Sequence, residues 1–128
     1  MIILDTHVFV WWAASRAKVS PRARRAIEKD RQPAICDISL WEVAKLVSLG
    51  RLKMDRDVEV WLDQAVEETG LEVIPIDAAI AARSNRIAAN FHGDPADQLI
   101  AATALERGVP LVTADEKLLA SSALKAVW

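Results

Sequence analysis

Short apolar runs alternate with helix-forming segments along the whole chain. The runs that read as strands are residues 1–5, 34–37, 71–76 and 109–113, with a last small strand over 125–127. The segments between them have apolar residues at helical spacing, and they open at caps such as Ser20-Pro21 and close at glycines such as Gly50. Strands that are each followed by a helix pair in parallel, because the helix returns the chain to the edge where the strand began. The sequence therefore predicts an α/β fold, a three-layer α/β/α sandwich with a mainly parallel central sheet.

The same reading gives the helices and loops. We expect helices over residues 7–14, 20–30, 39–49, 57–69, 77–89, 94–107 and 115–120, and a loop over 90–93. In the first of these helices, Val8, Trp11 and Trp12 are expected to face inward. At 128 residues, without a repeat or a linker, the chain is expected to form a single domain over residues 1–128.

Composition narrows the class of protein. With 52% hydrophobic and 27% charged residues, the chain reads as folded and globular. Its one cysteine, Cys36, excludes an intramolecular disulfide and suits the reducing cytoplasm. The apolar start is interrupted by Asp5 and His7, so it is not a secretory signal. No stretch approaches the ~20 apolar residues that span a bilayer. We therefore expect a cytoplasmic protein without a membrane partner.

Five acidic residues are expected to meet at one edge of the sheet: Asp5, Glu42, Asp94, Asp97 and Asp115. Asp5 ends the first apolar run, and Asp115 lies two residues past the fourth. Glu42 and Asp97 each fall in the first turn of an expected helix. Because the carboxyl ends of parallel strands share an edge, these side chains should crowd together where open α/β folds bind ligands. Crowded carboxylates repel each other unless a cation neutralises them, and an all-oxygen pocket suits Mg²⁺ or Mn²⁺. The pattern favours a metal-dependent nuclease.

Helix capping offers a structural alternative for several of these acids. Ser39-x-x-Glu42 and Thr113-x-x-Glu116 both match a capping box. Asp94 before Pro95 matches an N-cap. The capping and ligand interpretations are compatible, because helix N-termini at the sheet edge hold carboxylates at low cost.

The remaining two acids are weighed in the same way. Asp97 has a dipole-favoured place in a first turn as its own structural alternative. Asp5 is harder to explain structurally, because an acid at the end of an apolar strand adds nothing to a core and Thr6 offers it no positive charge. Four acids that coincide at one expected edge make a shared functional site the better interpretation.

Charge is unevenly distributed although the net charge is only −2. An early segment is basic, with Arg16, Lys18, Arg22, Arg24, Arg25, Lys29 and Arg31. A later segment is acidic, with Asp55, Asp57, Glu59, Asp63, Glu67, Glu68 and Glu72. Each can be a solvated helix face. The more specific hypothesis is that Arg22, Arg24 and Arg25 contact the phosphate backbone of a nucleic acid.

Four stretches, residues 3–7, 39–45, 94–104 and 111–115, resemble in order the motifs of the PIN domain, and within it the VapC-type toxins of bacterial toxin–antitoxin pairs. The resemblance covers essentially the whole chain. It implies that the acidic quartet is Asp5, Glu42, Asp97 and Asp115, which would bind the metal and carry catalysis. Thr6, Thr113 and Asp94 would not bind the metal themselves but would orient the carboxylates or water around it. Two departures remove positive charge from the pattern: Gln98 stands where arginine is frequent, and Ala114 where polar or basic residues are frequent.

The resemblance also implies an activity and its partners. The activity is an endoribonuclease dependent on Mg²⁺ or Mn²⁺, with Asp5 and Asp97 holding the main ion, Glu42 close by and Asp115 completing the pocket. His7 and His92 are interpreted as loop or supporting groups. The partners are an RNA substrate, a cognate antitoxin whose peptide lies across the active-site groove, and a second copy of the chain in a homodimer.

One apolar set exceeds what a small helical pair readily buries. Its members are Trp41, Val43, Leu46, Val47, Leu49, Leu52, Val58, Trp61 and Leu62. This set is either an interaction surface or ordinary core.

Three other functions remain open from the sequence. A HAD-type phosphatase also begins with a strand ending in aspartate, but it requires a second aspartate where His7 stands. The chain could be a receiver-like binding module, or a PIN domain that has lost catalysis and only binds RNA. It could also be an RNA-processing nuclease without a toxin role.

Overall fold

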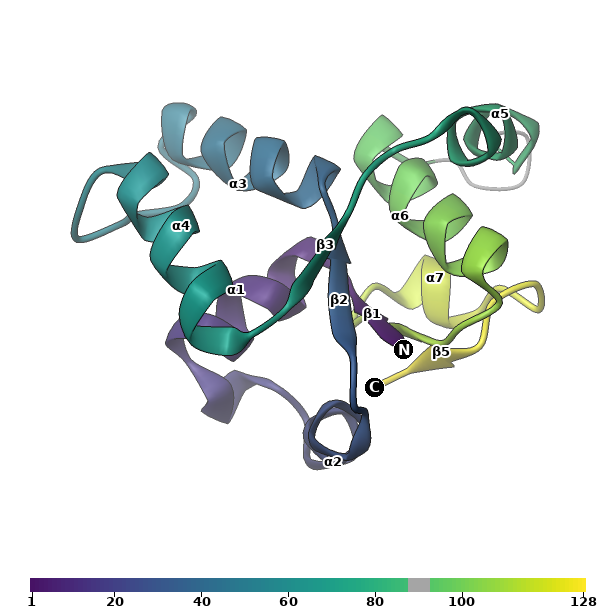
Figure 1. Ribbon diagram of the computed structural model, residues 1–128, viewed down its shortest axis with the longest axis horizontal. Helices are drawn as coiled ribbons and strands as arrows, with labels where there is room; N and C mark the ends of the chain where they lie inside the picture. The colour runs from purple at the N-terminus through teal and green to yellow at the C-terminus, as the bar shows by residue number, and fades with distance from the viewer. Residues whose placement is uncertain (88–92) are drawn as a thin grey trace.

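A computed structural model, which describes residues 1–87 and 93–128, contains a five-stranded parallel sheet (Figure 1). Its strands are β1 (Ile2–Leu4), β2 (Pro33–Cys36), β3 (Glu72–Ile74), β4 (Leu111–Val112) and β5 (Ala126–Val127). They lie in the order β3-β2-β1-β4-β5, and every pairing is parallel. The predicted parallel α/β fold is therefore confirmed, although each strand is shorter than or equal to the apolar run that predicted it.

The helices lie close to their expected positions. They are α1 (Thr6–Ala14), α2 (Pro21–Lys29), α3 (Ile38–Ser48), α4 (Val58–Thr69), α5 (Ala78–Ile87), α6 (Pro95–Arg107) and α7 (Glu116–Leu119), with a 3₁₀ turn η1 (Arg16–Lys18) after α1. The predicted loop 90–92, His92 and the end of the alanine-rich helix lie outside the described residues. Within the described ranges, no helix is both long and apolar enough to cross a membrane.

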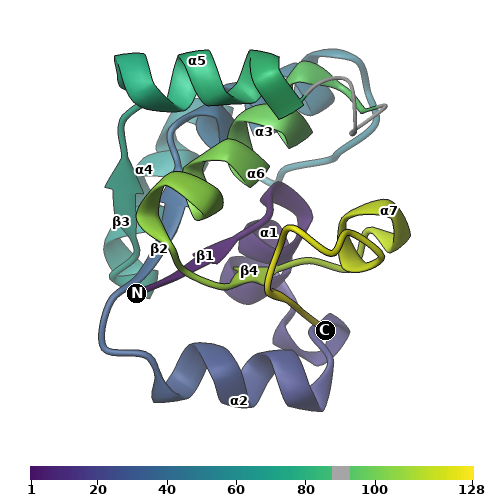
Figure 2. The same cartoon turned by 90° about the vertical axis from the view of Figure 1, so that its right-hand side faces the viewer.

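The sheet is covered on both faces, which gives the expected three layers. Along β1, Ile2 and Leu4 point into a core shared with α1, α2, α3 and α4. Ile3 points the other way, into a core shared with α5, α6 and α7. This alternation follows from the two-residue period of a strand. Figures 1 and 2 show the two helical layers on either side of the strands.

The prediction that three side chains of α1 face inward is confirmed only in part. Val8 and Trp12 are buried, as expected, but Trp11 is only half-buried. Its ring lies 5.7 Å from the ring of Trp128, centroid to centroid, at the end of the chain. The helical spacing could not reveal the contact with Trp128, because the two residues are more than a hundred positions apart in the chain.

Strand register brings the ends of β1, β2 and β4 into line. Leu4 pairs with Ile35 on one side and with Val112 on the other. The residues that follow Leu4 and Val112 are therefore neighbours at the carboxyl edge. This edge is the one where the acidic residues were expected to meet.

Candidate active site

Asp5 is the most buried of the acidic residues, with 7% of its surface exposed. It follows β1 directly and caps α1, accepting a hydrogen bond of 2.8 Å at Oδ1 from the backbone N–H of Thr6. Its other oxygen, Oδ2, accepts a 2.7 Å bond from the hydroxyl of Thr113. Burial raises the pKa of Asp5, and these two hydrogen bonds oppose the rise. Both oxygens are thus held in fixed directions.

Thr113 links Asp5 to Asp115. It is fully buried, and besides its bond to Asp5 its hydroxyl oxygen accepts a 3.0 Å bond from the backbone N–H of Asp115. Asp115 itself caps α7, accepting from the N–H groups of Lys117 and Leu118. The capping box expected from Thr113 to Glu116 is therefore wrong. The cap is Asp115, and Thr113 serves the carboxylates instead.

Ser39 and Thr6 form a second buried hydroxyl pair. Their oxygens are 2.9 Å apart, and both side chains are inaccessible to solvent. The capping box expected from Ser39 to Glu42 is wrong as well, since α3 begins at Ile38 and no side chain caps it. The sequence could have signalled Ser39 only as a cap; its contact with Thr6 depends on how α1 and α3 pack.

Glu42 projects from α3 toward the same edge. Burial raises the pKa of Glu42, a hydrogen bond from the Thr6 side chain lowers it, and the negative charges of Asp94 and Asp5 raise it further. Glu42 is therefore within electrostatic reach of carboxylates from two other segments. Thr6 contacts both Ser39 and Glu42, so it joins α1 to α3.

Asp97 is within electrostatic reach of all four of the other carboxylates. Burial raises its pKa to about 7, and the charges of Asp5, Glu42, Asp94 and Asp115, in that order, contribute to the rise. Asp94 caps α6 through a 2.8 Å bond from the N–H of Ala96, which leaves Asp97 in the first turn. Five carboxylates from four separate segments thus influence one another, as expected from the strand ends.

The donor set of this cluster fits a hard divalent cation. It consists of carboxylate oxygens with neighbouring hydroxyls, the ligands that Mg²⁺ and Mn²⁺ prefer. Among residues 1–87 and 93–128, no salt bridge from lysine or arginine neutralises any of the five carboxylates. In that same part of the chain, no three acidic, His or Cys side chains already stand close enough to hold a metal ion. The fit therefore rests on donor chemistry and mutual repulsion, not on preformed coordination.

The arginines of the basic segment do not converge in space as the carboxylates do. Arg22 and Arg25 are exposed on α2, whereas Arg24 is half-buried and donates from Nη2 to the carbonyl of Val19 at 3.2 Å. The end of α2 lies at the amino edge of the sheet, where Asp30 pairs with the N-terminal amine at 3.3 Å. The structure therefore does not gather the three arginines into one free patch.

The apolar set of α3 and α4 divides into core and surface. Val43 and Trp61 are buried, whereas Trp41 is 57% and Leu49 is 53% exposed. Between the two helices lies an apolar groove of about 480 Å³, with Glu59, Asp63 and Glu67 among its lining residues; we call it the α3–α4 groove. The core interpretation is therefore confirmed for Val43 and Trp61, whereas an interaction surface at the exposed members stays a prediction.

Comparison with known proteins places the chain in a family. The model of the PIN domain matches residues 2–122. The chain belongs to the PIN-domain family. It is 38% identical over 117 residues to Ribonuclease VapC22 of Mycobacterium tuberculosis, which covers 91% of this chain and 88% of that protein. Because the chain belongs to this family, a HAD-type phosphatase is no longer an alternative.

Solved structures share the PIN fold seen here. VapBC2 from Rickettsia felis, bound to a DNA fragment from its promoter, superposes with a TM-score of 0.71 at 21% identity, covering 98% of this chain and 97% of that one. A toxin–antitoxin complex from Klebsiella pneumoniae gives a TM-score of 0.69 at 22% identity, covering 97% and 95%. At such identities the likeness concerns the fold.

Proposed function

We propose that this PIN-domain protein is an endoribonuclease that depends on Mg²⁺ or Mn²⁺ and acts as the toxin of a toxin–antitoxin pair. The observation that carries the proposal is that Asp97 is buried within electrostatic reach of four other carboxylates; burial first, and then their charges, raise its pKa to about 7. The identity to a ribonuclease over most of the chain supports the same activity. An RNA-processing nuclease without a toxin role would use the same site.

In this proposal Asp5, Glu42, Asp97 and Asp115 hold the cation. When bound, the ion supplies a more acidic water and stabilises negative charge on the phosphate. Thr113 and the N–H of Thr6 fix the two oxygens of Asp5, so that this carboxylate meets the ion without reorganising.

The supporting residues divide into two groups. Thr6 and Ser39 orient the α3 side of the site, where Glu42 lies. Asp94 fixes the start of α6 and adds negative charge beside Asp97.

The cleavage test compares the wild type with Asp97→Asn on a single-stranded RNA, with Mg²⁺, Mn²⁺ or excess chelator. We expect cleavage only by the wild type with metal. The control is Asp63→Asn, the same change at an exposed residue on α4. Equal cleavage by Asp97→Asn, or cleavage in chelator, would contradict the mechanism.

The toxin role is tested separately by inducible expression in a bacterial host. We expect growth arrest with discrete RNA cuts from the wild type and neither from Asp97→Asn. Co-expression of the protein encoded by the adjacent gene should restore growth if that protein is the antitoxin. Cleavage in vitro without arrest would instead favour the RNA-processing alternative. Assembly as a homodimer stays a prediction.

We propose that the cognate antitoxin also binds a second surface, besides the active-site groove. The α3–α4 groove is apolar through Leu40, Ala44 and Leu62 among others, and it carries the acidic side chains of Glu59, Asp63 and Glu67. The three acids recur every four residues along α4, so they share one face. Charge complementarity therefore fits this groove to a basic, amphipathic segment of the antitoxin.

A further inference from the structure

His7 is a basic side chain at the edge of the carboxylate cluster. It is exposed in the first turn of α1, two residues after Asp5, and α1 begins where β1 ends (Figure 2). Its charge lowers the pKa of both Asp5 and Glu42. Among the main influences that the described residues exert on these two pKa values, His7 supplies the one positive charge. The imidazole is therefore close to carboxylates from two different segments.

The ring nitrogens of His7 are available to a ligand. Within residues 1–87 and 93–128, neither nitrogen has a hydrogen-bond partner, and His7 forms no salt bridge. An imidazole carries at least one N–H donor whether it is neutral or charged. This donor is therefore present without any change of protonation, and only solvent or a ligand can accept from it.

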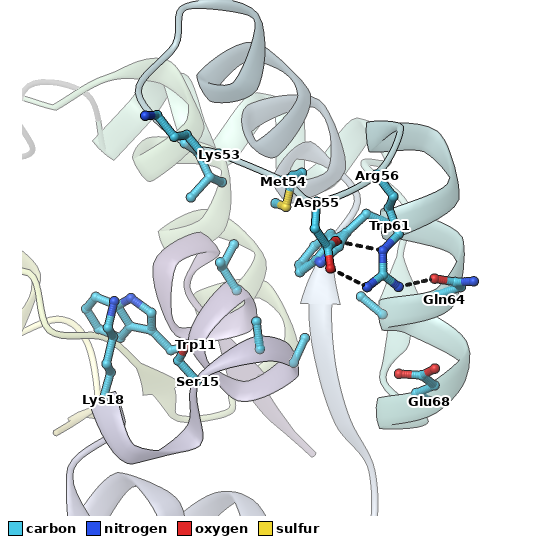
Figure 3. Close-up of a pocket in the computed structure, with 15 residues that line it drawn as sticks. Trp11, Ser15, Lys18, Lys53, Met54, Asp55, Arg56, Trp61, Gln64 and Glu68 are labelled. Carbon is cyan, nitrogen blue, oxygen red and sulfur yellow. Dashed lines mark hydrogen bonds and ion pairs between the residues drawn. The ribbon is translucent and has the colours of Figure 1, made fainter.

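Trp11 supports the His7 ring from the next turn of α1. The two ring centroids lie 6.0 Å apart, with the planes inclined at 52°. The ring of Trp11 is itself backed by that of Trp128, 5.7 Å away between centroids. Trp11 also lines a pocket of about 490 Å³ between α1 and α4 (Figure 3). The His7 ring thus rests against a half-buried neighbour on one side, while the rest of it stays exposed.

The carboxylates keep a negative charge even with one divalent cation bound. Asp97 is within reach of four other carboxylates, and in the described part of the chain no lysine or arginine forms a salt bridge with any of the five. One divalent cation balances two such charges, so an RNA phosphate beside it is still repelled by the remainder. An N–H donor next to the phosphate offsets this repulsion, and side-chain N–H groups are common partners of phosphate oxygens.

We propose that His7 donates a hydrogen bond from its imidazole to a phosphate oxygen of the RNA strand that is bound at the carboxylates. The inference rests on the proposed nuclease function, which brings the RNA backbone to this edge. An antitoxin segment could also approach His7. However, a segment attracted to clustered carboxylates is basic, and a basic side chain offers an N–H group no acceptor. Phosphate oxygens are acceptors, and they suit the free donor better.

The test measures binding of a dye-labelled oligouridylate of about eight nucleotides. A generic RNA is sufficient, because a phosphate contact carries no sequence information. Ca²⁺, which takes the same oxygen ligands, replaces Mn²⁺, and the RNA is checked to be intact afterwards. In a series of this RNA, one phosphate at a time is replaced by a neutral methylphosphonate.

We expect one methylphosphonate to weaken wild-type binding roughly three- to tenfold, the effect of a single hydrogen bond. His7→Leu should weaken binding of the unmodified RNA by a similar factor, and the same methylphosphonate should have little further effect in this variant. Leucine keeps an apolar contact for Trp11, and the replaced side chain is exposed. Equal sensitivity of the wild type and His7→Leu at every position would overturn the proposal, because then no phosphate contacts His7.

Two more variants separate the N–H donor from general charge. His7→Gln keeps a side-chain N–H and should recover most of the affinity lost in His7→Leu. Lys29→Leu is the control, since it removes an exposed positive charge from the end of α2, at the amino edge of the sheet. It should leave the methylphosphonate pattern of the wild type unchanged. Equal loss of affinity in His7→Leu and Lys29→Leu would contradict a specific contact.

Catalysis and metal binding distinguish a phosphate contact from other roles of His7. With Mn²⁺, His7→Leu should raise KM and leave kcat nearly unchanged, because the contact is made equally before and in the transition state. Affinity for Mn²⁺ without RNA should remain that of the wild type. A fall in kcat at unchanged KM, or Mn²⁺ binding as weak as in Asp97→Asn, would give His7 a different role and overturn the proposal.

The outcomes also separate this inference from the proposed nuclease activity. If one phosphate depends on His7 but the wild type cuts no RNA with Mg²⁺ or Mn²⁺, the contact stands and the nuclease activity fails. If the wild type cuts RNA and no phosphate depends on His7, the nuclease activity stands and this inference fails. Circular dichroism of each variant checks that the fold is intact.

Discussion

Thr113 donates a 2.7 Å hydrogen bond from Oγ1 to Oδ2 of Asp5, although 108 positions separate the two residues in the chain. The bond exists because β4 lies beside β1 and Leu4 pairs with Val112. It fixes the most buried carboxylate of the site and moderates the rise in its pKa.

Thr113→Val keeps the shape of the side chain but removes this donor. We expect it to destabilise the fold by about 1–3 kcal/mol, because it leaves a buried oxygen of Asp5 without its partner. The pKa of Asp5 should rise further, and affinity for Mn²⁺ should fall. Urea unfolding and calorimetric titration measure the two effects. Thr103→Val is the matched control: Thr103 is also buried, but it donates to the Leu99 carbonyl at 2.7 Å, away from Asp5. Equal loss of Mn²⁺ affinity in both variants would contradict a specific role for Thr113.

Asp97 should make the metal-free protein less stable at neutral pH than in mild acid. Its folded-state pKa of about 7 exceeds the ordinary value of 3.8, so between these values the folded state binds more protons than the unfolded state. The free energy of unfolding should therefore fall as pH rises from about 4 to about 7.

Asp97→Asn should remove much of this slope and raise stability at pH 8 by roughly 1–2 kcal/mol, a figure reduced because solvent screens the half-buried site. Chemical unfolding across this pH range in chelator measures it. An unchanged slope would show that burial and the neighbouring charges do not raise the pKa of Asp97. Added Mn²⁺ should raise the melting temperature of the wild type and leave that of Asp97→Asn nearly unchanged.

The basic helix α2 gives a separate prediction about RNA. Neutralising Arg22, Arg24 and Arg25 together to glutamine should weaken RNA binding and flatten its salt dependence, if they contact phosphate. Arg24→Gln alone should have little effect on the salt slope, since this side chain already donates to the carbonyl of Val19. If the salt dependence of RNA binding is the same in the triple variant as in the wild type, the arginines of α2 are ordinary solvated surface and do not contact phosphate.

The acidic face of α4 gives a prediction about the partner. Asp63→Lys should weaken retention of the co-expressed antitoxin by tenfold or more, because it places a like charge against a basic segment. RNA cleavage should be unaffected. Glu28→Lys is the control, as Glu28 is an exposed helical acid of α2 that does not line the α3–α4 groove. Equal retention of the antitoxin by the two variants would exclude the groove as its docking surface.

Local sequence patterns were enough to predict the strand–helix order and the sheet edge where the acidic residues meet. Apolar run length and helix caps such as Ser20 and Asp94 are local properties, so they were readable without the fold. The parallel sheet then followed, because a chain that alternates strands with helices has few other ways to bury both.

The hydrogen-bond partners of the buried hydroxyls, by contrast, depend on packing between distant segments. Ser39 and Thr113 both matched capping boxes, yet Ser39 bonds Thr6 and Thr113 bonds Asp5. The half-buried Trp11 and its pocket were equally hidden from the sequence. Each of these contacts joins residues far apart in the chain, and a hydrogen-bonding group takes whichever partner packing brings within about 3 Å. Local spacing shows which partners a group could have, and packing decides which one it has.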